Sequence, residues 1–155
     1  MARLSESVRF TSTNSVPKKV IDDAVRFHGH LGPFLILGLK AGLFANDVLG
    51  KDYFRTRTIV ETESNPPCSC FVDGIQFVTG CTMGKRNVEL RNGCSLSALF
   101  VKDDKRLKLS LKSSILQSLR KPSSKKSSEN IAMDLSKRHV QELFDIEESP
   151  NKKER

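Results

Sequence analysis

Residues 33–50 read PFLILGLKAGLFANDVLG, and this stretch decides how the chain folds. Proline favours the first turn of a helix and glycine favours the residue after its end, so the spacing predicts a helix from Pro33 to Leu49. The helix is apolar on most faces, which predicts that it lies buried. Gly38 and Gly42 are four residues apart on one face, where a neighbouring backbone can approach closely.

The segments around this helix predict further helices and several strands. The expected elements are, in order, a helix over 15–27, a strand over 55–63, a short helix over 70–78, a weak strand over 87–91, a hairpin of 95–101 with 106–111, a helical turn over 113–119 and a helix over 134–148. This order predicts an α+β fold in which helices pack on a mixed β-sheet.

The length of 155 residues corresponds to about one domain. The expected organisation is a flexible arm over 1–15, an α+β domain over 16–120, a Ser/Lys-rich linker over 121–133, a C-terminal helix over 134–148 and a tail over 149–155. No stretch approaches the roughly 20 apolar residues of a membrane span. The first residues are polar and do not resemble a secretory signal. We therefore expect a cytoplasmic protein without a membrane partner.

The chain is basic, with 26 Lys+Arg against 18 Asp+Glu and a net charge of +8. Residues 105–128 hold eight basic residues and no acidic one. A nucleic-acid interface is one interpretation, because such a segment would neutralise phosphates. The segment has no aromatic residue for base stacking and no known nucleic-acid motif. These absences favour a solvated basic strand and linker over a nucleic-acid partner.

Two groups of residues have side chains that bind transition metals. In His28-Gly29-His30 the glycine permits a bend on which both imidazoles can converge, although the histidines can equally cap or pack at a helix junction. Cys70 begins a predicted helix, whose dipole is expected to lower the pKa of its thiol, and Cys81 follows the end of that helix. Buried cysteines acting as small apolar residues are the alternative.

The turn over 80–85 reads GCTMGK and contains glycine, threonine and lysine. It lacks the spacing of a phosphate-binding P-loop and does not join a strand to a helix. We interpret it as a tight turn that presents Cys81 and Lys85 into a cleft.

Both groups together resemble the family named after the E component of formylmethanofuran dehydrogenase. The resemblance is carried by FHGHLGP at 27–33 with Gly38 and Gly42 after it, by CFVDGIQ at 70–76, by TGCTMGK at 79–85 and by Asn87. It implies an α+β fold similar to the catalytic-domain class of glyceraldehyde phosphate dehydrogenase. The family pattern HGHxCPG has a cysteine where this chain has Gly32, and no appended zinc ribbon is expected here.

The resemblance also implies a metal site and a setting for it. Its metal ligands would be His28, His30, Cys70 and Cys81, holding zinc or another divalent transition metal, with Asp73, Gln76 and Lys85 lining the cleft. Glu61 is a further candidate base, at the end of the predicted strand. Whether these groups catalyse a reaction stays open.

The implied role is that of a metal-binding protein accessory to, or part of, formylmethanofuran and molybdenum/tungsten one-carbon metabolism. Its expected partners are a second copy of the chain, in a homodimer, and other subunits of a molybdenum/tungsten enzyme. A dimeric scaffold that has lost its metal and any chemistry is the alternative.

Overall fold

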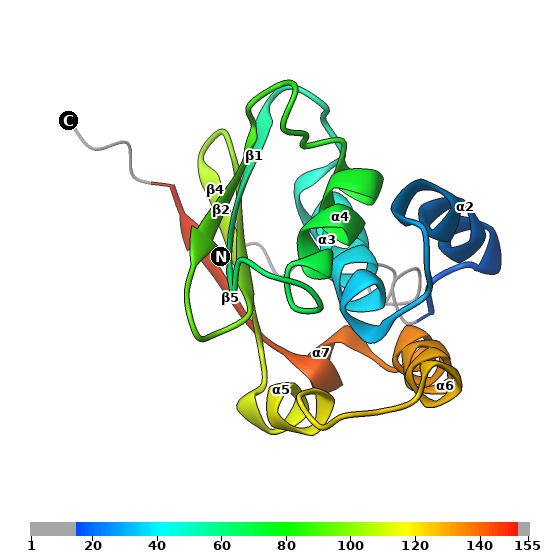
Figure 1. Ribbon diagram of the computed structural model, residues 1–155. Coiled ribbons are helices and arrows are strands. Elements are labelled where there is room, and N and C mark those ends of the chain that lie inside the picture. Colours follow the sequence, from blue (N-terminus) through cyan, green and yellow to red (C-terminus); the bar gives the residue numbers. More distant parts are fainter. Residues whose placement is uncertain (1–14, 152–155) are drawn as a thin grey trace.

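The computed structural model describes residues 15–151, and the expected arm over 1–15 lies outside this range except for Ser15 (Figure 1). The helices are α2 (Lys18–His28), α3 (Pro33–Leu49), α4 (Cys70–Thr79), α5 (Ser113–Leu119), α6 (Lys125–Lys137) and α7 (Val140–Leu143). The strands are β1 (Thr56–Thr62), β2 (Val88–Asn92), β3 (Ser97–Lys102), β4 (Lys105–Leu111) and β5 (Phe144–Pro150). No helix within residues 15–151 has both the length and the apolar character needed to cross a bilayer.

The five strands form one mixed sheet in the order β2-β1-β3-β4-β5. Strands β1 and β2 run parallel, whereas the other neighbours are antiparallel. Along β1 the side chains alternate, so that Thr58 and Val60 are buried while Arg57 and Glu61 are exposed. This alternation gives the sheet one apolar face, and the predicted α+β class is confirmed.

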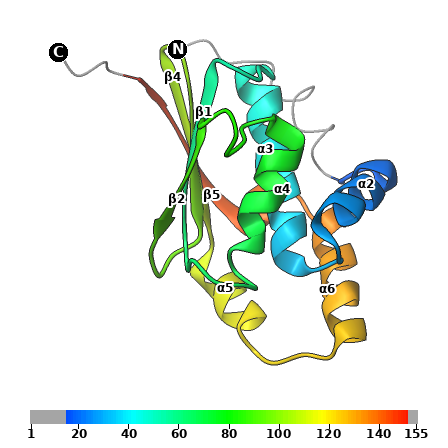
Figure 2. The ribbon, with the colours of Figure 1, turned by 45° about the horizontal axis from the view of Figure 1, so that its top comes forward.

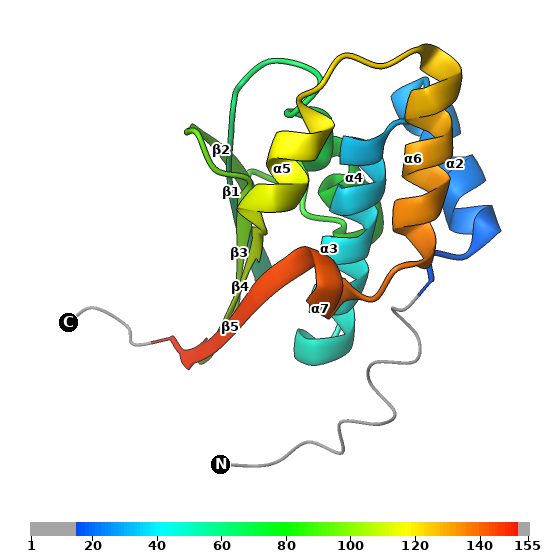
Figure 3. The ribbon, with the colours of Figure 1, turned by 90° about the horizontal axis from the view of Figure 1, so that it is seen from below.

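The helices cover one face of the sheet in two layers (Figures 2 and 3). Helices α3 and α4 lie next to the sheet, and α2 and α6 lie outside them. Helix α3 begins and ends at the predicted residues and is buried along most of its length. Because α4, α6 and the sheet already enclose it, α3 needs no second copy of the chain to be buried, so its apolar faces do not call for a dimer.

Glycines allow α3 and α4 to pack with their backbones almost in contact. A Cβ added to Gly38 would lie 2.2 Å from the Phe71 carbonyl oxygen, and one added to Gly74 would lie 2.4 Å from the Leu35 carbonyl oxygen. Both distances are far below contact, and backbone atoms cannot move away as a flexible side chain can. The predicted close approach at Gly38 is therefore confirmed, and its partner is the helix that begins at Cys70.

We expect Gly38→Ala to lower the free energy of unfolding by about 1–3 kcal/mol, since the added methyl group forces the two helices apart. Gly84→Ala is the matched control, because a Cβ at Gly84 meets nothing within 4 Å. Urea unfolding followed by circular dichroism measures both variants. Equal stability of the Gly38→Ala variant and the wild type would contradict the close packing.

The C-terminal third differs from the sequence prediction in two places. The expected linker over 121–133 is wrong, because α6 occupies most of it. Ser124 caps this helix by accepting a hydrogen bond from the Ser127 N–H at 3.1 Å, and Ala132 and Leu135 form its buried stripe. The serines that suggested a linker thus begin a helix, as serine does at N-caps.

The expected helix over 134–148 is also wrong. Helix α6 ends at Lys137, the short α7 follows, and residues 144–150 form β5. Strand β5 pairs antiparallel with β4, placing Ile146 opposite Leu109 and Phe144 opposite Leu111. The alternation of apolar and acidic residues over 144–147 is a strand pattern with period two. The basic strand β4 and the acidic strand β5 also complement each other, since Lys108 lies opposite Glu147.

Lys40 is the one lysine on the buried helix α3, and none of its surface is exposed. Its amine donates to the Ser136 carbonyl oxygen at 3.3 Å. Burial lowers the pKa of Lys40 from 10.5 to about 8, and the nearby negative charge of Glu142 opposes part of this change. The residue therefore connects α3 to α6 and α7 at the cost of burying a cation at neutral pH.

We expect the free energy of unfolding of the wild type to rise, relative to that of Lys40→Met, as the pH increases from about 8 to about 10.5. In this window the unfolded chain still binds a proton on Lys40 and the folded chain does not, and the full difference is about 3 kcal/mol. The Ser136 carbonyl keeps the Val16 N–H as a donor at 2.9 Å in the variant. Parallel stability curves for the two proteins across this window would contradict the prediction.

Candidate metal centre

Three predicted ligands meet at the junction of α2, α3 and α4. His28 is the last residue of α2, His30 lies in the link to α3, and Cys70 is the first residue of α4. One ligand atom from each side chain lies within 4.8 Å of the others. The two imidazole ring centroids are 4.5 Å apart. Residues from distant parts of the sequence thus converge into one group, which we call the His-His-Cys group.

Gly29 makes this convergence possible. Its φ of 107° lies in the left-handed region, where glycine carries no penalty for a side chain. Its N–H donates to the Val25 carbonyl oxygen at 2.7 Å and closes the last turn of α2. The chain then reverses, so the imidazoles before and after Gly29 lie on the same side, which is the bend expected from the sequence.

Asp73 fixes the orientation of the His28 ring. His28 Nδ1 lies 2.6 Å from Asp73 Oδ2, and a carboxylate only accepts, so Nδ1 carries the hydrogen. Nε2 of the same ring therefore presents a lone pair. This atom is buried and has no hydrogen-bond partner within residues 15–151. A buried lone pair on a carboxylate-bound imidazole, beside a second imidazole and a thiol, matches what a zinc ion or a similar metal requires.

A second residue supports Asp73 in turn. Gln76 donates from Nε2 to Asp73 Oδ1 at 3.5 Å and accepts the Met83 N–H at 3.1 Å. The chain of contacts runs from His28 through α4 to the turn after Gly80. Asp73 and Gln76 thus act on the His-His-Cys group through His28, and we assign them as positioning residues.

The thiol of Cys70 differs from the sequence expectation. Burial raises its pKa, and the negative charge of Asp73 raises it further. The prediction that the start of α4 lowers the pKa is wrong, because these two effects outweigh the backbone hydrogen bond at the helix start. Metal binding at this thiol must therefore displace a proton, as it does at cysteine ligands generally.

Cys81 lies apart from the His-His-Cys group. It follows the end of α4, whereas Cys70 begins this helix of ten residues, which is about 15 Å long. Its side chain is fully buried, and its Sγ donates to the Thr56 carbonyl oxygen of β1 at 3.3 Å. The structure therefore brings three of the four predicted ligands together and uses the fourth, Cys81, in the packing of α4 on the sheet.

Two further candidates also lie away from this group. Lys85 is exposed and donates from Nζ to the Gly80 carbonyl oxygen and, at 3.1 Å, to Thr82 Oγ1, so it closes the end of α4 instead of lining a cleft. Glu61 is exposed on the uncovered face of β1 and accepts from Ser95 Oγ at 2.8 Å. The prediction that the turn over 80–85 presents Cys81 and Lys85 into a cleft is thus wrong.

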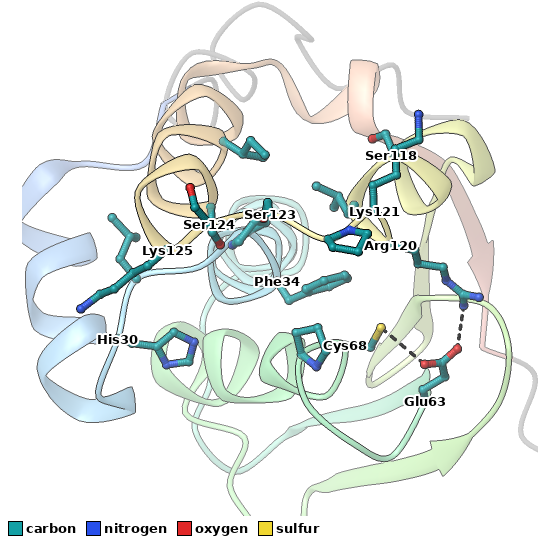
Figure 4. A pocket seen from close by; sticks show the side chains of 17 residues that line it. His30, Phe34, Glu63, Cys68, Ser118, Arg120, Lys121, Ser123, Ser124 and Lys125 are labelled. Atoms are coloured by element: carbon teal, nitrogen blue, oxygen red, sulfur yellow. Dashed lines mark hydrogen bonds and ion pairs between the residues drawn. The ribbon is translucent and has the colours of Figure 1, made fainter.

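The His-His-Cys group separates two cavities. The first has a volume of about 700 Å³ and is lined by His30 (Figure 4). The second has a volume of about 1060 Å³ and is lined by His28, Cys70, Asp73 and Gln76. Solvent or a small molecule can thus approach the group from two sides.

The end of the first cavity opposite His30 carries a separate polar group, formed by Glu63, Cys68 and Arg120 (Figure 4). Arg120 Nη2 lies 2.8 Å from Glu63 Oε1, and Cys68 Sγ lies 3.8 Å from Glu63 Oε2. Burial and the charge of Glu63 raise the pKa of the Cys68 thiol.

The sequence model of the family described as FmdE, Molybdenum formylmethanofuran dehydrogenase operon, matches residues 27–153. This span includes the three ligand residues, the whole sheet and every helix after α2. The chain belongs to the FmdE family. The resemblance inferred from its histidine and cysteine motifs is thereby confirmed.

A relative of this FmdE protein is the probable S-adenosyl-L-methionine-binding protein of Archaeoglobus fulgidus. The two are 34% identical over 70 residues, which cover 42% of this chain and 18% of the relative. The chain thus matches less than a fifth of the relative's length.

Gly32 and Phe34 are the two positions where this chain departs from the family pattern HGHxCPG, and Gly32 replaces its cysteine. A Cβ added to Gly32 would lie 3.5 Å from His30 Nε2, with ordinary contact and no clash. The backbone of Gly32 is extended, with a φ of −150°, which any residue adopts. The Cβ of a cysteine at this position would therefore lie beside the His30 ring of the His-His-Cys group.

Sequence reasoning missed Glu63 and the role of Asp73 as the partner of His28. Glu63 ends the predicted strand and carries no pattern of its own. Asp73 carried one available signal, because it lies three residues after Cys70 on the same helix face. Its contact with His28 joins residues 45 positions apart, which spacing alone does not predict.

We expect Asp73→Asn to weaken zinc binding by roughly 10-fold to 100-fold, as loss of a carboxylate behind a histidine ligand does. An amide donates or accepts at this place with equal ease, so the His28 ring loses its fixed tautomer. Competition with a chelator of known affinity measures the change. Asp134→Asn, at an exposed site on α6, is the control. Equal zinc affinity in the Asp73→Asn variant would show that the contact does not orient His28.

Proposed function

We propose that this protein binds a divalent transition metal ion through His28, His30 and Cys70, and that zinc is the preferred ion. The observation that carries the proposal is the buried Nε2 of His28, which has no partner within the described residues while Asp73 fixes its ring. Two imidazoles and a thiolate are zinc ligands, and three protein ligands leave a coordination position open. Such a position is typical of catalytic sites and not of structural ones.

Each residue around the ligands has a role in this proposal. A bound zinc ion acts as a Lewis acid and lowers the pKa of a water molecule that it holds. Asp73 keeps the hydrogen of His28 on Nδ1, and Gln76 holds Asp73 in place. Cys70 gives up its proton when the ion binds. The second cavity supplies the route by which a displaced proton reaches solvent.

The metabolic setting follows from membership of the FmdE family. We propose that the protein is accessory to, or part of, formylmethanofuran and molybdenum/tungsten one-carbon metabolism, with other subunits of such an enzyme as partners. We place it in the cytoplasm, because all four cysteines are free thiols, as expected in a reducing compartment.

Elemental analysis of protein purified without a histidine tag tests the metal site. The proposal expects about one zinc or other transition ion per chain, as one three-ligand group implies. Protein that stays free of metal after incubation with each ion in turn would overturn it. The same outcome would favour a scaffold without metal.

The scaffold alternative rests on the uncovered face of the sheet. No helix within residues 15–151 covers this face, and the partly buried Ile59, Leu99 and Val101 lie at its centre. A second copy of the chain packed here would form a homodimer. Light scattering measures the mass, and a dimer without bound metal is the result that this alternative requires.

A further inference from the structure

The Ser/Lys-rich segment over 118–128 is not used by the proposed metal site, yet it forms one side of the first cavity (Figure 4). The segment connects α5 to α6 and contributes nine of the residues that line this cavity. His30 lies on the facing side. Part of the basic segment over 105–128, which suggested a nucleic-acid interface in the sequence, thus covers a cavity that reaches the His-His-Cys group.

The size and walls of this cavity suit a small organic molecule. Its volume of about 700 Å³ is in the range of ligand pockets, roughly 300–1,000 Å³, and too small for a folded macromolecule. Apolar side chains contribute much of its lining, among them Phe34, Pro67, Leu119 and Ile131. A ligand therefore has an apolar or aromatic body.

The charges around the cavity select an anion. Its lining includes Arg120, Lys121 and Lys125 but only one acidic residue, Glu63. Arg120 and Glu63 pair with each other at 2.8 Å and cancel. Neither lysine amine has an ion-pair partner within residues 15–151, so two positive charges remain uncompensated. Both lysines are exposed at the border of the cavity, where their charges favour an anion over a cation.

The cavity has two different ends. His30 and Lys125 lie toward one end, and Glu63, Cys68 and Arg120 lie at the other, with Phe34 between them (Figure 4). We propose that the cavity binds a small organic anion, whose carboxylate or phosphate group is attracted by the charges of Lys121 and Lys125 and whose apolar body lies on Phe34. The approach of this anion to the open metal position rests on the proposed function, whereas the charge and shape of the cavity do not.

Calorimetric titration with three related probes tests the proposal. Benzoate and phenyl phosphate carry an acidic group on an aromatic ring, and benzyl alcohol is their uncharged counterpart. We expect at least one anion to bind both zinc-loaded and zinc-free protein at least tenfold more tightly than benzyl alcohol. The stronger of the two anions identifies carboxylate or phosphate as the natural group. Equal binding of all three probes, or no binding of either anion, would overturn the proposal.

Paired variants test the lysines. Lys121→Gln with Lys125→Gln removes two charges from the cavity, and Lys105→Gln with Lys108→Gln removes two charges from β4 in the same basic run. Only the first pair is expected to weaken binding of the anion, by at least fivefold. An equal loss in both pairs would show a general charge effect and would overturn the site.

The titration of zinc-free protein distinguishes failure of the anion site from failure of the proposed metal site. Binding of zinc but of neither anion would leave the metal site standing and overturn the anion site. Binding of an anion that depends on Lys121 and Lys125, in a chain that binds no metal, would support the anion site and overturn the proposed function.

Discussion

His28→Ala is expected to lower the affinity for zinc by at least about 100-fold, the largest loss that we expect from a single substitution. The variant removes one of three ligands and also the group through which Asp73 acts. Cys70→Ser is expected to act similarly, because a hydroxyl does not replace a thiolate as a ligand of zinc. Competition with a chromogenic chelator at constant pH measures both losses.

Cys94→Ser is the control for this experiment. Cys94 is exposed, and its backbone lies between β2 and β3, so its thiol belongs to neither cavity. The control should bind zinc as the wild type does. Thermal unfolding of each metal-free variant verifies that the loss is not one of folding. Wild-type affinity in a folded His28→Ala variant would contradict the assignment of this ligand.

Gly32→Cys is expected to have the largest effect in the opposite direction, raising the affinity for zinc by at least about tenfold. A Cβ at this position lies 3.5 Å from His30 Nε2, so the thiol of the variant can complete a tetrahedral set of two histidines and two cysteines. The site would change from open to closed. The gain in affinity would then be accompanied by loss of the open coordination position of the proposed site.

Gly32→Ser is the matched control, because it adds a side chain of nearly the same size. It should leave the affinity within about threefold of the wild type, since a serine hydroxyl is a poor ligand of zinc. If Gly32→Ser and Gly32→Cys bind zinc equally well, residue 32 does not face the ion, and the geometry described around His30 is wrong.

Much of the fold is already determined by local sequence patterns. The helix over 33–49 follows from its proline, its glycine and its apolar faces. Strand β4 of the hairpin follows from the alternation of leucine with polar, mostly basic residues. The structure of the C-terminal part could not be predicted in this way, because a Ser/Lys-rich composition is found both in linkers and in capped surface helices. Only the packing of α6 on α3 distinguishes the two.

The candidate site could likewise be predicted only in part from the sequence. The family resemblance nominated His28, His30 and Cys70 as ligands, and the structure brings these together. Cys81 was nominated by the same reasoning, yet its position after a helix of ten residues directs it to the sheet. Likewise, the raised pKa of Cys70 depends on burial and on Asp73, and local sequence predicted the opposite direction. Contacts between distant residues decide both outcomes.

X-ray absorption at the zinc edge measures the ligands of a bound ion directly. We expect one sulfur at about 2.3 Å and two imidazole nitrogens at about 2.0–2.1 Å, with a further oxygen from water. The Cys70→Ser variant should lose the sulfur, and the Cys94→Ser variant should keep it. Zinc bound only by nitrogen and oxygen in the wild type, or by two sulfurs, would contradict a site built from His28, His30 and Cys70.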